Sequence, residues 1–471
     1  MNIVVVGGGT AGWLSALILK NETNHNITVI DNSSIGPLGV GEGTTGLFGD
    51  IIRKYLSEEE FVKECGATPK MGIEFINWYK NDFISPLNGT FSCNEKYDYA
   101  LYYGMKNSNI NSYSKTGLLA ENKKISIKRG TTKYSFLTEG INAYHLDTHK
   151  TINFMKTKCV KMGVKFIDSS IVSVTKNFVN KITSINCQDK TINCDFVIDC
   201  SGFHRKIISE YNPKFISYGK WLSVDTALTF RISWDNIIYK NPVTISRALS
   251  CGWMWMIPIQ QNIGCGIVYD SKFVTDEEII SEVSNILGKK IVIKKKIKFQ
   301  SGRLKQSLYR NVASIGTCYS FLEPLQATSI HTTIIQVKKI VDFLNKKISA
   351  RQYNNYCADI VDNYADFVSL HYQFKYIDNE FWQSRIPRKY TQKIIEKCKN
   401  KIISEKDYNV KNIDCASHSL WSFTLAGGEL LKYNNQLFTK ENIRNIKFWE
   451  RQIDSTLLDY ISFSEFLKMY I

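Results

Sequence analysis

The chain opens with an apolar run, a glycine-rich turn and a segment of helical periodicity. Residues 3–6 (IVVV) are apolar, residues 7–12 (GGGTAG) form the turn, and residues 14–18 then supply an apolar helical face. A second apolar run at 27–31 ends in an aspartate. This order of strand, glycine turn, helix and strand predicts one βαβ half of a dinucleotide-binding fold.

Further along the chain, the spacing of apolar residues predicts blocks of helices and strands. Residues from about 45 to 150 predict a helical, aromatic-rich insertion, with 73–78 (IEFINW) as one of its helices. An apolar strand at 195–199 is followed at 221–270 by alternating apolar and polar residues, which is typical of an antiparallel sheet. From residue 330 onward apolar positions recur at i, i+4 and i+7, which predicts helices.

These patterns predict an α/β protein with two parts. Residues 1–330 combine the dinucleotide-binding core with an antiparallel β-sheet layer, and residues 331–471 form a helical module on the substrate side. A chain of 471 residues with 44% apolar content is long enough for two or three packed modules.

Composition narrows the class of protein. The net charge is +16, but the lysines are scattered and show no basic stripe with interleaved aromatics, so we expect no nucleic-acid partner and only a field that attracts small anions. The 12 cysteines contain no CxxC pair, so we expect no metal site. No apolar run approaches the ~20 residues that span a bilayer, and the N-terminus lacks the basic segment of a signal peptide. We therefore expect a cytoplasmic protein with no membrane partner. Length and composition do not determine its oligomeric state.

The glycine turn carries the first candidate chemistry. In a GxGxxG turn, the first glycine makes the turn, the second admits a pyrophosphate and the third lets the helix meet the strand. Gly7, Gly9 and Gly12 have this spacing, and Asp31 is placed to accept hydrogen bonds from a ribose hydroxyl. The alternative is a tight turn without a ligand, and the motif by itself does not distinguish FAD from NAD.

Three segments together resemble the flavin-dependent halogenases of the tryptophan-halogenase type. They are GGGTAGW at 7–13, GVGEGT at 39–44 and WMWMIP at 253–258, which match the family's nucleotide motif, its flavin-strap segment and its WxWxIP signature in the same order. The resemblance implies a glutathione-reductase-like, FAD-binding Rossmann-type core. The cofactor-binding residues it implies are Gly7, Gly9, Thr10, Ala11, Gly12, Asp31, Gly39, Val40, Gly41, Glu42 and Gly316.

In this family the double-tryptophan signature is held to keep the flavin chemistry away from the substrate. The corresponding channel residues are Trp253, Trp255 and Pro258, although such a segment taken alone is typical of plain sheet core.

The chemistry implied by the resemblance uses FADH2, O2 and a chloride, bromide or iodide ion to make hypohalous acid. A lysine then holds the oxidised halogen, as a haloamine or by hydrogen bonding, and presents it to an electron-rich aromatic ring. Lys70 stands at the family's catalytic-lysine position, although a lysine taken at random is usually a solvated surface charge. Because no second nucleotide-binding unit is apparent, we expect a separate flavin reductase to supply FADH2.

Residues 321–329 read FLEPLQATS and resemble the family's FLEPLEST-G stretch with three departures. The usual active-site glutamate is Gln326, the next serine is Ala327, and the glycine is Ser329. A glutamine cannot take a proton, so we expect Gln326 to orient Lys70 or the hypohalous acid. Thr328 and Ser329 precede an apolar helix whose N-terminus favours an anion, so they are the candidate halide site; the alternative is a simple N-cap by either residue.

The substrate residues are the least determined. Trp421 and Phe423 are candidates to stack on a planar substrate, with core packing as the alternative. The segment 415–421 does not reproduce the family's tryptophan-binding cluster, so we expect a small electron-rich aromatic substrate such as a phenol, indole or aniline. His145 is expected to be a hydrogen-bonded structural histidine.

Two other functions remain open at this stage. A flavin-dependent monooxygenase of the same core fold usually carries a Gly-Asp dipeptide near this point, whereas this chain has Gly316 followed by Thr317. A catalytically inactive FAD-binding protein remains open because of Gln326.

Overall fold

The structure is a computed structural model of the whole chain, and a small part of that chain is left out of the description. The residues described are 1–36, 39, 41–89, 98–106, 109–130, 143–234, 241–400, 403–408, 410–412, 414–431 and 438–469.

A six-stranded sheet forms the first layer, and its long strands are parallel. Strand β1 is nearly fully buried, as expected for a parallel strand that is covered on both faces. From edge to edge the strands are β21 (Leu308–Tyr309), β22 (Val312–Ser314), β13 (Phe196–Asp199), β1 (Asn2–Val6), β2 (Asn26–Asp31) and β9 (Lys165–Asp168).

A seven-stranded sheet forms the second layer, and only its β5/β16 pair is parallel. Its strands, in spatial order, are β19 (Lys295–Lys298), β15 (Thr226–Ile232), β18 (Ile263–Tyr269), β17 (Gly252–Pro258), β16 (Val243–Leu249), β5 (Gly72–Ile76) and β6 (Phe83–Pro86).

Four small sheets complete the strands of the described ranges. One of them joins the segment that precedes α2 to the segment that carries Lys70, and it lies against the cavity described below. The small sheets are β3 (Glu42–Gly43) with β8 (Ala143–Leu146) and β4 (Thr68–Lys70); β14 (Phe215–Ser217) with β20 (Gly302–Leu304) and β23 (Ser320–Phe321); β10 (Ile171–Lys176) with β11 (Ile182–Cys187) and β12 (Thr191–Asn193); and β7 (Lys124–Lys128) with β24 (Tyr460–Ser462).

Helices cover both sheets and dominate the last third of the chain. In the described ranges, none of them is both long and apolar enough to cross a bilayer. They are α1 (Thr10–Glu22), α2 (Gly46–Tyr55), α3 (Glu58–Glu64), α4 (Tyr99–Lys106), α5 (Lys115–Glu121), α6 (Thr148–Lys161), α7 (Asp276–Leu287), α8 (Thr328–Leu344), α9 (Ala350–His371), α10 (Glu380–Gln383), α11 (Lys389–Asn400), α12 (His418–Gly427), α13 (Lys440–Glu450), α14 (Ile453–Asp459) and α15 (Phe463–Lys468).

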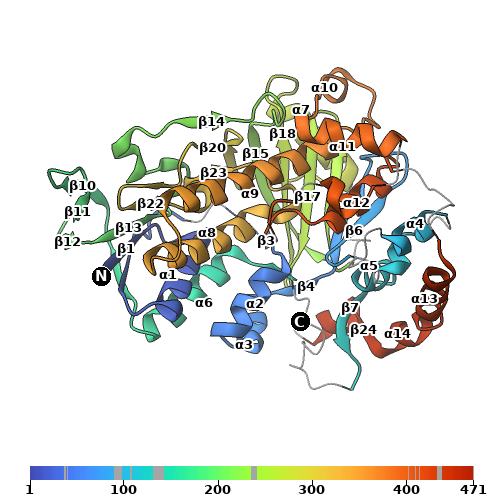
Figure 1. Cartoon of the computed structure of the whole chain (residues 1–471), viewed down its shortest axis with the longest axis horizontal. Helices are drawn as coiled ribbons and strands as arrows, with labels where there is room; N and C mark the ends of the chain where they lie inside the picture. The colour runs from blue at the N-terminus through green and yellow to red at the C-terminus, as the bar shows by residue number, and fades with distance from the viewer. Residues whose placement is uncertain are drawn as a thin grey trace.

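Figure 1 shows the parallel sheet with α1 and α6 at one end of the molecule and the seven-stranded sheet in the middle. The C-terminal helices α13 and α14 lie at the other end, beside α4 and α5. Because β24 pairs with β7, the end of the chain returns to the region that precedes residue 130.

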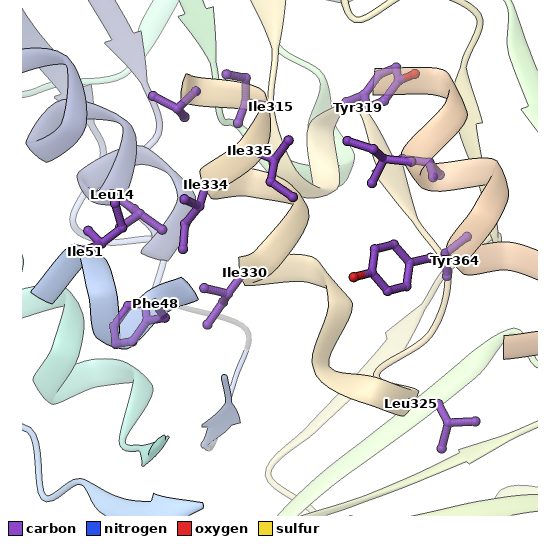
Figure 2. Packing of buried hydrophobic residues seen from close by; sticks show 14 of the residues in the cluster. Leu14, Phe48, Ile51, Ile315, Tyr319, Leu325, Ile330, Ile334, Ile335 and Tyr364 are labelled. Atoms are coloured by element: carbon purple, nitrogen blue, oxygen red, sulfur yellow. The ribbon is translucent and has the colours of Figure 1, made fainter. Parts of the chain in front are cut away.

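Apolar residues of helix α8 pack against helices α1 and α2. In Figure 2, Ile330 and Ile334 of α8 point toward Leu14 of α1 and Phe48 of α2. Ile334, Leu14 and Phe48 are fully buried, and burying a side chain of this size contributes about 1.5–3 kcal/mol. The contact fixes the start of α8 next to the glycine turn that precedes α1.

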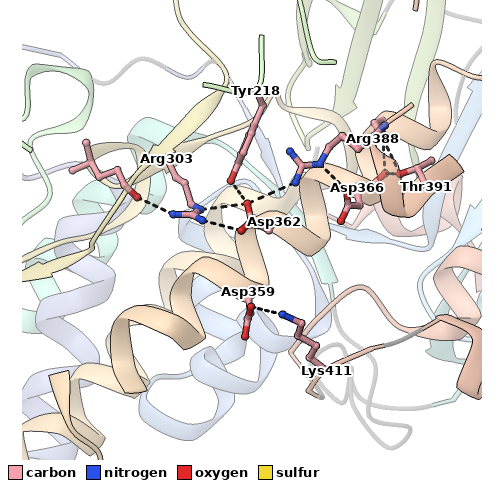
Figure 3. Close-up of polar contacts among 10 residues, drawn as sticks. Tyr218, Arg303, Asp359, Asp362, Asp366, Arg388, Thr391 and Lys411 are labelled. Carbon is pink, nitrogen blue, oxygen red and sulfur yellow. Dashed lines mark hydrogen bonds and ion pairs between the residues drawn. The ribbon is translucent and has the colours of Figure 1, made fainter. Parts of the chain in front are cut away.

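An ionic network fixes α9 on its outer side (Figure 3). Asp362 accepts hydrogen bonds from the Arg303 guanidinium, at 2.8 Å from Nη2 and 3.3 Å from Nε, and from the Tyr218 hydroxyl. Arg388 donates to Asp366, one turn further along the helix, at 2.6 Å. Arg303 is only 8% exposed, so its charge depends on Asp362 for compensation.

Much of the predicted architecture is confirmed. The βαβ opening, the strand at 195–199, the antiparallel sheet at 221–270 and the helices after 330 are all present. The predicted division at residue 330 falls inside α8 and stays a prediction.

The predicted helical insertion is wrong in part. Residues 73–78 are not a helix: they form most of β5 and the turn that follows it. Both edges of β5 are paired, with β16 and with β6, and Asn77 then takes a positive φ of 61° that ends the strand. The insertion also contains β4, β6, β7 and β8, so tertiary pairing overrides the local helical pattern.

Two aspartates on α9 provide a matched test of this network. Asp362→Ala leaves the buried Arg303 without its carboxylate, so we expect the free energy of unfolding to fall by about 2–3 kcal/mol. Asp359→Ala removes a pair with the exposed Lys411 and is expected to cost about 0–1 kcal/mol. Urea unfolding of both variants measures the difference, and equal losses would show that Arg303 does not depend on Asp362.

Candidate active site

One cavity of about 740 Å³ joins the two layers of the fold. Its walls come from the glycine turn after β1, the end of β2, the seven-stranded sheet and the start of α8. Most of the residues predicted to bind a cofactor, a halide or the oxidised halogen lie on these walls.

The glycine turn forms one end of the cavity, and its three glycines differ in their surroundings. Gly7 has φ +104°, and a Cβ there would lie 2.5 Å from the Cys200 carbonyl oxygen. A Cβ on Gly12 would lie 1.8 Å from the Gly7 oxygen, so these two positions are closed by the protein itself. A Cβ on Gly9 would meet nothing within 4 Å, so Gly9 faces open space.

The start of α1 and the end of β2 add polar groups to this end. Gly9 is the N-cap of α1 and supplies no side-chain hydrogen bond, so the first-turn N–H groups at Thr10 and Ala11 remain available to an anion. Asp31 lies at the end of β2 and also lines the cavity.

Gly316 packs against the same turn. Its φ is +65°, and a Cβ there would lie 2.9 Å from the Ala11 Cβ, which explains why glycine is required. Its N–H donates to Gln336 Oε1 at 3.0 Å, which holds it beside the cavity.

The predicted strap segment contributes to the lining of the cavity. Gly39, Gly41 and Glu42 line it, whereas Val40 lies outside the described residues. The Thr10 hydroxyl donates to Glu42 at 3.3 Å. Burial raises the pKa of the Glu42 carboxyl to about 7, against the opposing effect of this hydrogen bond.

Lys70 lies on β4, with its amine in the wall of the same cavity. The side chain is 1% exposed, and Nζ donates to the backbone oxygen of Thr44 at 3.2 Å. Burial lowers the pKa of the Lys70 amine to about 7, because a charged ammonium is poorly solvated there. A large fraction of Lys70 is therefore a neutral amine at neutral pH.

His145 lies beside Lys70 and is hydrogen-bonded by two threonines, as expected from the sequence. The Thr68 hydroxyl donates to the Pro258 backbone oxygen at 2.6 Å, so it accepts from His145 Nδ1 at 3.4 Å. His145 Nε2 then accepts from the Thr244 hydroxyl at 2.8 Å. Burial, followed by the charge on Lys70, lowers the pKa of His145 well below its ordinary value, so the ring stays neutral.

The turn before α8 has an unusual backbone. Gln326 and Ala327 both take positive φ, at 68° and 54°, in a conformation that costs about 1–2 kcal/mol for each non-glycine residue. Ala327 is the N-cap of α8 and supplies no side-chain hydrogen bond. The alternative of an N-cap by Thr328 or Ser329 is therefore wrong: both are first-turn residues, and both line the cavity.

The Gln326 side chain has a different partner from the one expected. It lines the cavity, but its amide nitrogen lies 2.9 Å from His371 Nε2. Lys70 instead donates to Thr44, so the predicted orientation of Lys70 by Gln326 is not seen.

The two signature tryptophans stand side by side on β17. Trp253 and Trp255 point to the same face, their ring centroids lie 6.0 Å apart, and both line the cavity. Trp255 covers Gly266, where a Cβ would lie 2.0 Å from the indole. Pro258 is buried at the end of the strand and does not line the cavity, so it contributes to the sheet and not to a channel wall.

Trp421 and Phe423 are core residues, and the prediction that they contact substrate is not supported by their positions. They are 0% and 1% exposed, and neither lines the cavity. Trp421 packs against Phe367 and Tyr390, with centroid distances of 5.0 and 6.0 Å. Their positions agree with the core alternative, because both lie on the buried part of α12.

Three buried residues near the site were not assigned a role from the sequence. Tyr372 donates to both oxygens of Glu323, at 3.0 and 3.1 Å, and burial raises the pKa of this carboxyl to about 8. His371, the partner of Gln326, is also fully buried. Glu323 belongs to the FLEPLQATS segment that the sequence analysis already examined. His371 and Tyr372 lie far from that segment in the sequence, and no sequence pattern connects them to it.

Within the described ranges, no group of three or more histidine, cysteine, aspartate or glutamate side chains is placed to hold a metal ion. The chemistry available at this cavity comes from a buried amine, a helix N-terminus, two indoles and a site with room for a nucleotide.

Comparisons with known proteins match nearly the whole chain. A family model described as tryptophan halogenase matches residues 2–451. The tryptophan 7-halogenase of Lentzea aerocolonigenes is 27% identical over 428 residues, which cover 81% of this chain and 78% of that protein. The tryptophan 6-halogenase of Streptomyces albogriseolus is 26% identical over 438 residues, with 84% and 80% covered.

Solved structures agree at the level of the fold. A tryptophan halogenase from Shewanella frigidimarina superposes with a TM-score of 0.90 at 22% identity, covering 100% of this chain and 97% of that one. A flavin-dependent halogenase from Brevundimonas gives 0.86 at 23% identity, with 100% and 99% covered. The predicted Rossmann-type core, antiparallel layer and helical module are thereby confirmed.

The lowered pKa of Lys70 makes stability depend on pH. Below about pH 7 the lysine is protonated in both the folded and the unfolded chain, and the cost of burying the cation is fully present. Between about 7 and the unfolded value of ~10.4, only the unfolded chain carries the proton, so stability rises with pH.

We expect the free energy of unfolding of the wild type, minus that of Lys70→Met, to rise between about pH 7 and pH 10 by up to about 1.4 kcal/mol per pH unit. Below about pH 7 this difference is expected not to change with pH. Urea unfolding of both proteins across the range measures it, and a difference independent of pH would mean that Lys70 titrates normally.

Proposed function

The chain belongs to the tryptophan halogenase family, and we propose that it halogenates an electron-rich aromatic substrate, using FADH2, O2 and a halide, with Lys70 as the relay of the oxidised halogen. The observation that carries this proposal is the buried amine of Lys70 in the same cavity as the nucleotide turn and the start of α8.

The glycine end of the cavity fits FAD. Gly9 leaves open the space that a pyrophosphate needs, the N-terminus of α1 offers uncapped N–H groups, and Asp31 is placed for a ribose hydroxyl. Reduced FAD, supplied by a separate flavin reductase, provides with O2 the oxidising power that converts halide to hypohalous acid.

The halide is proposed to sit at the N-terminus of α8, next to Thr328 and Ser329. The helix has 17 residues, its cap residue Ala327 offers no side-chain oxygen, and its first turn faces the cavity. Uncapped N–H groups and the helix dipole both favour an anion there.

Lys70 is suited to receive halogen because it is largely a neutral amine near pH 7. A neutral amine has a free electron pair, which can take the halogen from hypohalous acid and release water, or its N–H can hold the acid by a hydrogen bond. Thr44 fixes the nitrogen through its backbone oxygen, 3.2 Å away. The strap segment, which ends at Thr44, therefore positions Lys70 as well as lining the cavity.

The two neighbouring indoles in the cavity support an aromatic substrate. Trp253 and Trp255 present two neighbouring indoles to the cavity. Because Trp421 and Phe423 are core residues, they do not form a clamp for free tryptophan, and we propose a phenol, indole or aniline as the substrate. Mass spectrometry of products with chloride, bromide and iodide separates halogen substitution from oxygen insertion and from an inactive protein.

Gly9→Val tests the cofactor site. The branched side chain fills the open space at Gly9, so we expect the affinity for FAD to fall at least about a hundredfold, while folding is retained because no protein atom lies within 4 Å of the new Cβ. Fluorescence titration with oxidised FAD measures the affinity. Binding as tight as that of the wild type would place the nucleotide elsewhere.

Lys70→Met tests the relay. We expect halogenated product to be lost, while FAD binding and flavin-dependent O2 consumption stay within about twofold of wild type, because the lysine acts after the halide is oxidised. Lys150→Ala, on α6 and hydrogen-bonded to Gln261, is the matched control and should keep full activity. Retained regioselective halogenation in Lys70→Met would assign the chemistry to free hypohalous acid.

A further inference from the structure

Gln326 and His371 form a buried pair whose protons can be assigned from their neighbours. His371 Nδ1 lies 3.1 Å from the backbone oxygen of Phe367, and Nε2 lies 2.9 Å from Gln326 Nε2. A carbonyl oxygen only accepts, so His371 Nδ1 must carry a proton and donate it.

The surroundings of His371 keep the ring neutral. Phe75 and Phe367 contact the imidazole, with centroid distances of 5.0 and 5.1 Å, and Trp78 and Phe374 lie at 6.1 and 5.9 Å. Burial lowers the pKa of His371 to about 4. A neutral imidazole protonated at Nδ1 has a lone pair at Nε2, so Nε2 accepts and the Gln326 amide nitrogen donates.

This hydrogen bond fixes which end of the Gln326 amide faces the cavity. His371 is fully buried and does not line the cavity, whereas Gln326 does. With its nitrogen directed to His371, the amide presents its carbonyl oxygen on the other side.

We propose that His371 is a positioning residue that orients the Gln326 carbonyl into the cavity, where it accepts a hydrogen bond from a ring N–H or O–H of the aromatic substrate. This inference rests on the proposed function for the identity of the ligand as an aromatic substrate. It adds a selection rule: a ring that carries a donor binds more tightly than the same ring with that donor methylated.

The pair also explains why glutamine suits this turn. A glutamate at position 326 would place a carboxylate oxygen against the Nε2 lone pair, and two acceptors repel each other. The conflict ends only if one proton is added, either to His371, which then becomes a cation, or to the carboxyl group, which then donates to Nε2. Gln326 and His371 are therefore matched, and a change at one alters the protonation of the other.

Two substitutions at His371 separate positioning from packing. His371→Gln keeps an acceptor at the reach of Nε2 for the Gln326 amide, whereas His371→Asn keeps only a donor near Phe367. Calorimetric titration with indole, phenol and aniline, each against its methylated partner (1-methylindole, anisole and N,N-dimethylaniline), gives the affinity ratio. Circular dichroism and FAD titration verify that both variants fold.

We expect the wild type to bind at least one donor-bearing ring about tenfold more tightly than its methylated partner, as a single hydrogen bond allows. His371→Gln should keep most of this ratio, and His371→Asn should reduce it to about one. The reverse order would assign His371 a purely structural role at Phe367. A wild-type ratio near one for all three pairs would overturn the acceptor at Gln326.

The protonation of His371 is measurable without any substrate. In ¹⁵N-histidine NMR, with His371→Gln used for assignment, we expect wild-type His371 to be neutral and protonated at Nδ1 between about pH 5 and pH 8. In Gln326→Glu we expect the Nε2 signal to move toward that of a protonated nitrogen, because the added proton is then shared between Nε2 and the carboxyl group. A wild-type ring that carries its proton at Nε2 would disprove the pairing.

Failure of this inference differs from failure of the proposed function. The NMR and binding measurements need no halogenation, so a protein that forms no halogenated product can still show the His371 tautomer and the affinity ratio. Conversely, an active halogenase with a ratio of one retains its function and loses the selection rule.

Discussion

The burial of one amine is the constraint on which the site depends. Lys70 is held in the wall of a cavity between two sheets, with a backbone oxygen as its hydrogen-bond acceptor. Burial without a carboxylate partner disfavours the ammonium form and brings the pKa to about 7. A lysine on an exposed strand would stay charged and have no free electron pair for a halogen.

The fold supplies this environment through three contacts of distant segments. The small sheet of β3, β8 and β4 brings the strap, His145 and Lys70 together. Helix α8 packs on α1 and α2, which places the Gln326 turn and the first turn of α8 on the same cavity as the glycine turn. Helix α9, fixed on its outer side by Asp362 and Arg303, carries His371 to Gln326. The site is thus built by packing among segments separated by up to about three hundred residues.

The sequence predicted what local pattern and motif spacing encode. The βαβ opening, the antiparallel strands and the C-terminal helices follow from periodicity, and Lys70 and the glycine residues follow from motifs. It did not predict β5, because IEFINW has the spacing of a helix and becomes a strand only through pairing on both edges. Trp421 was misassigned because burial on α12 is a tertiary property. His371 was missed because its partner lies 45 positions away.

The protonation of Lys70 is the most direct test of the central claim that a buried, neutral amine relays the halogen. Nitrogen and carbon NMR of labelled lysine, with the Lys70 signal assigned by its loss in Lys70→Met, follows the titration of this one group. We expect its midpoint at about pH 7. A midpoint at or above ~10, the value of a solvated lysine, would contradict the role of Lys70 as a neutral amine.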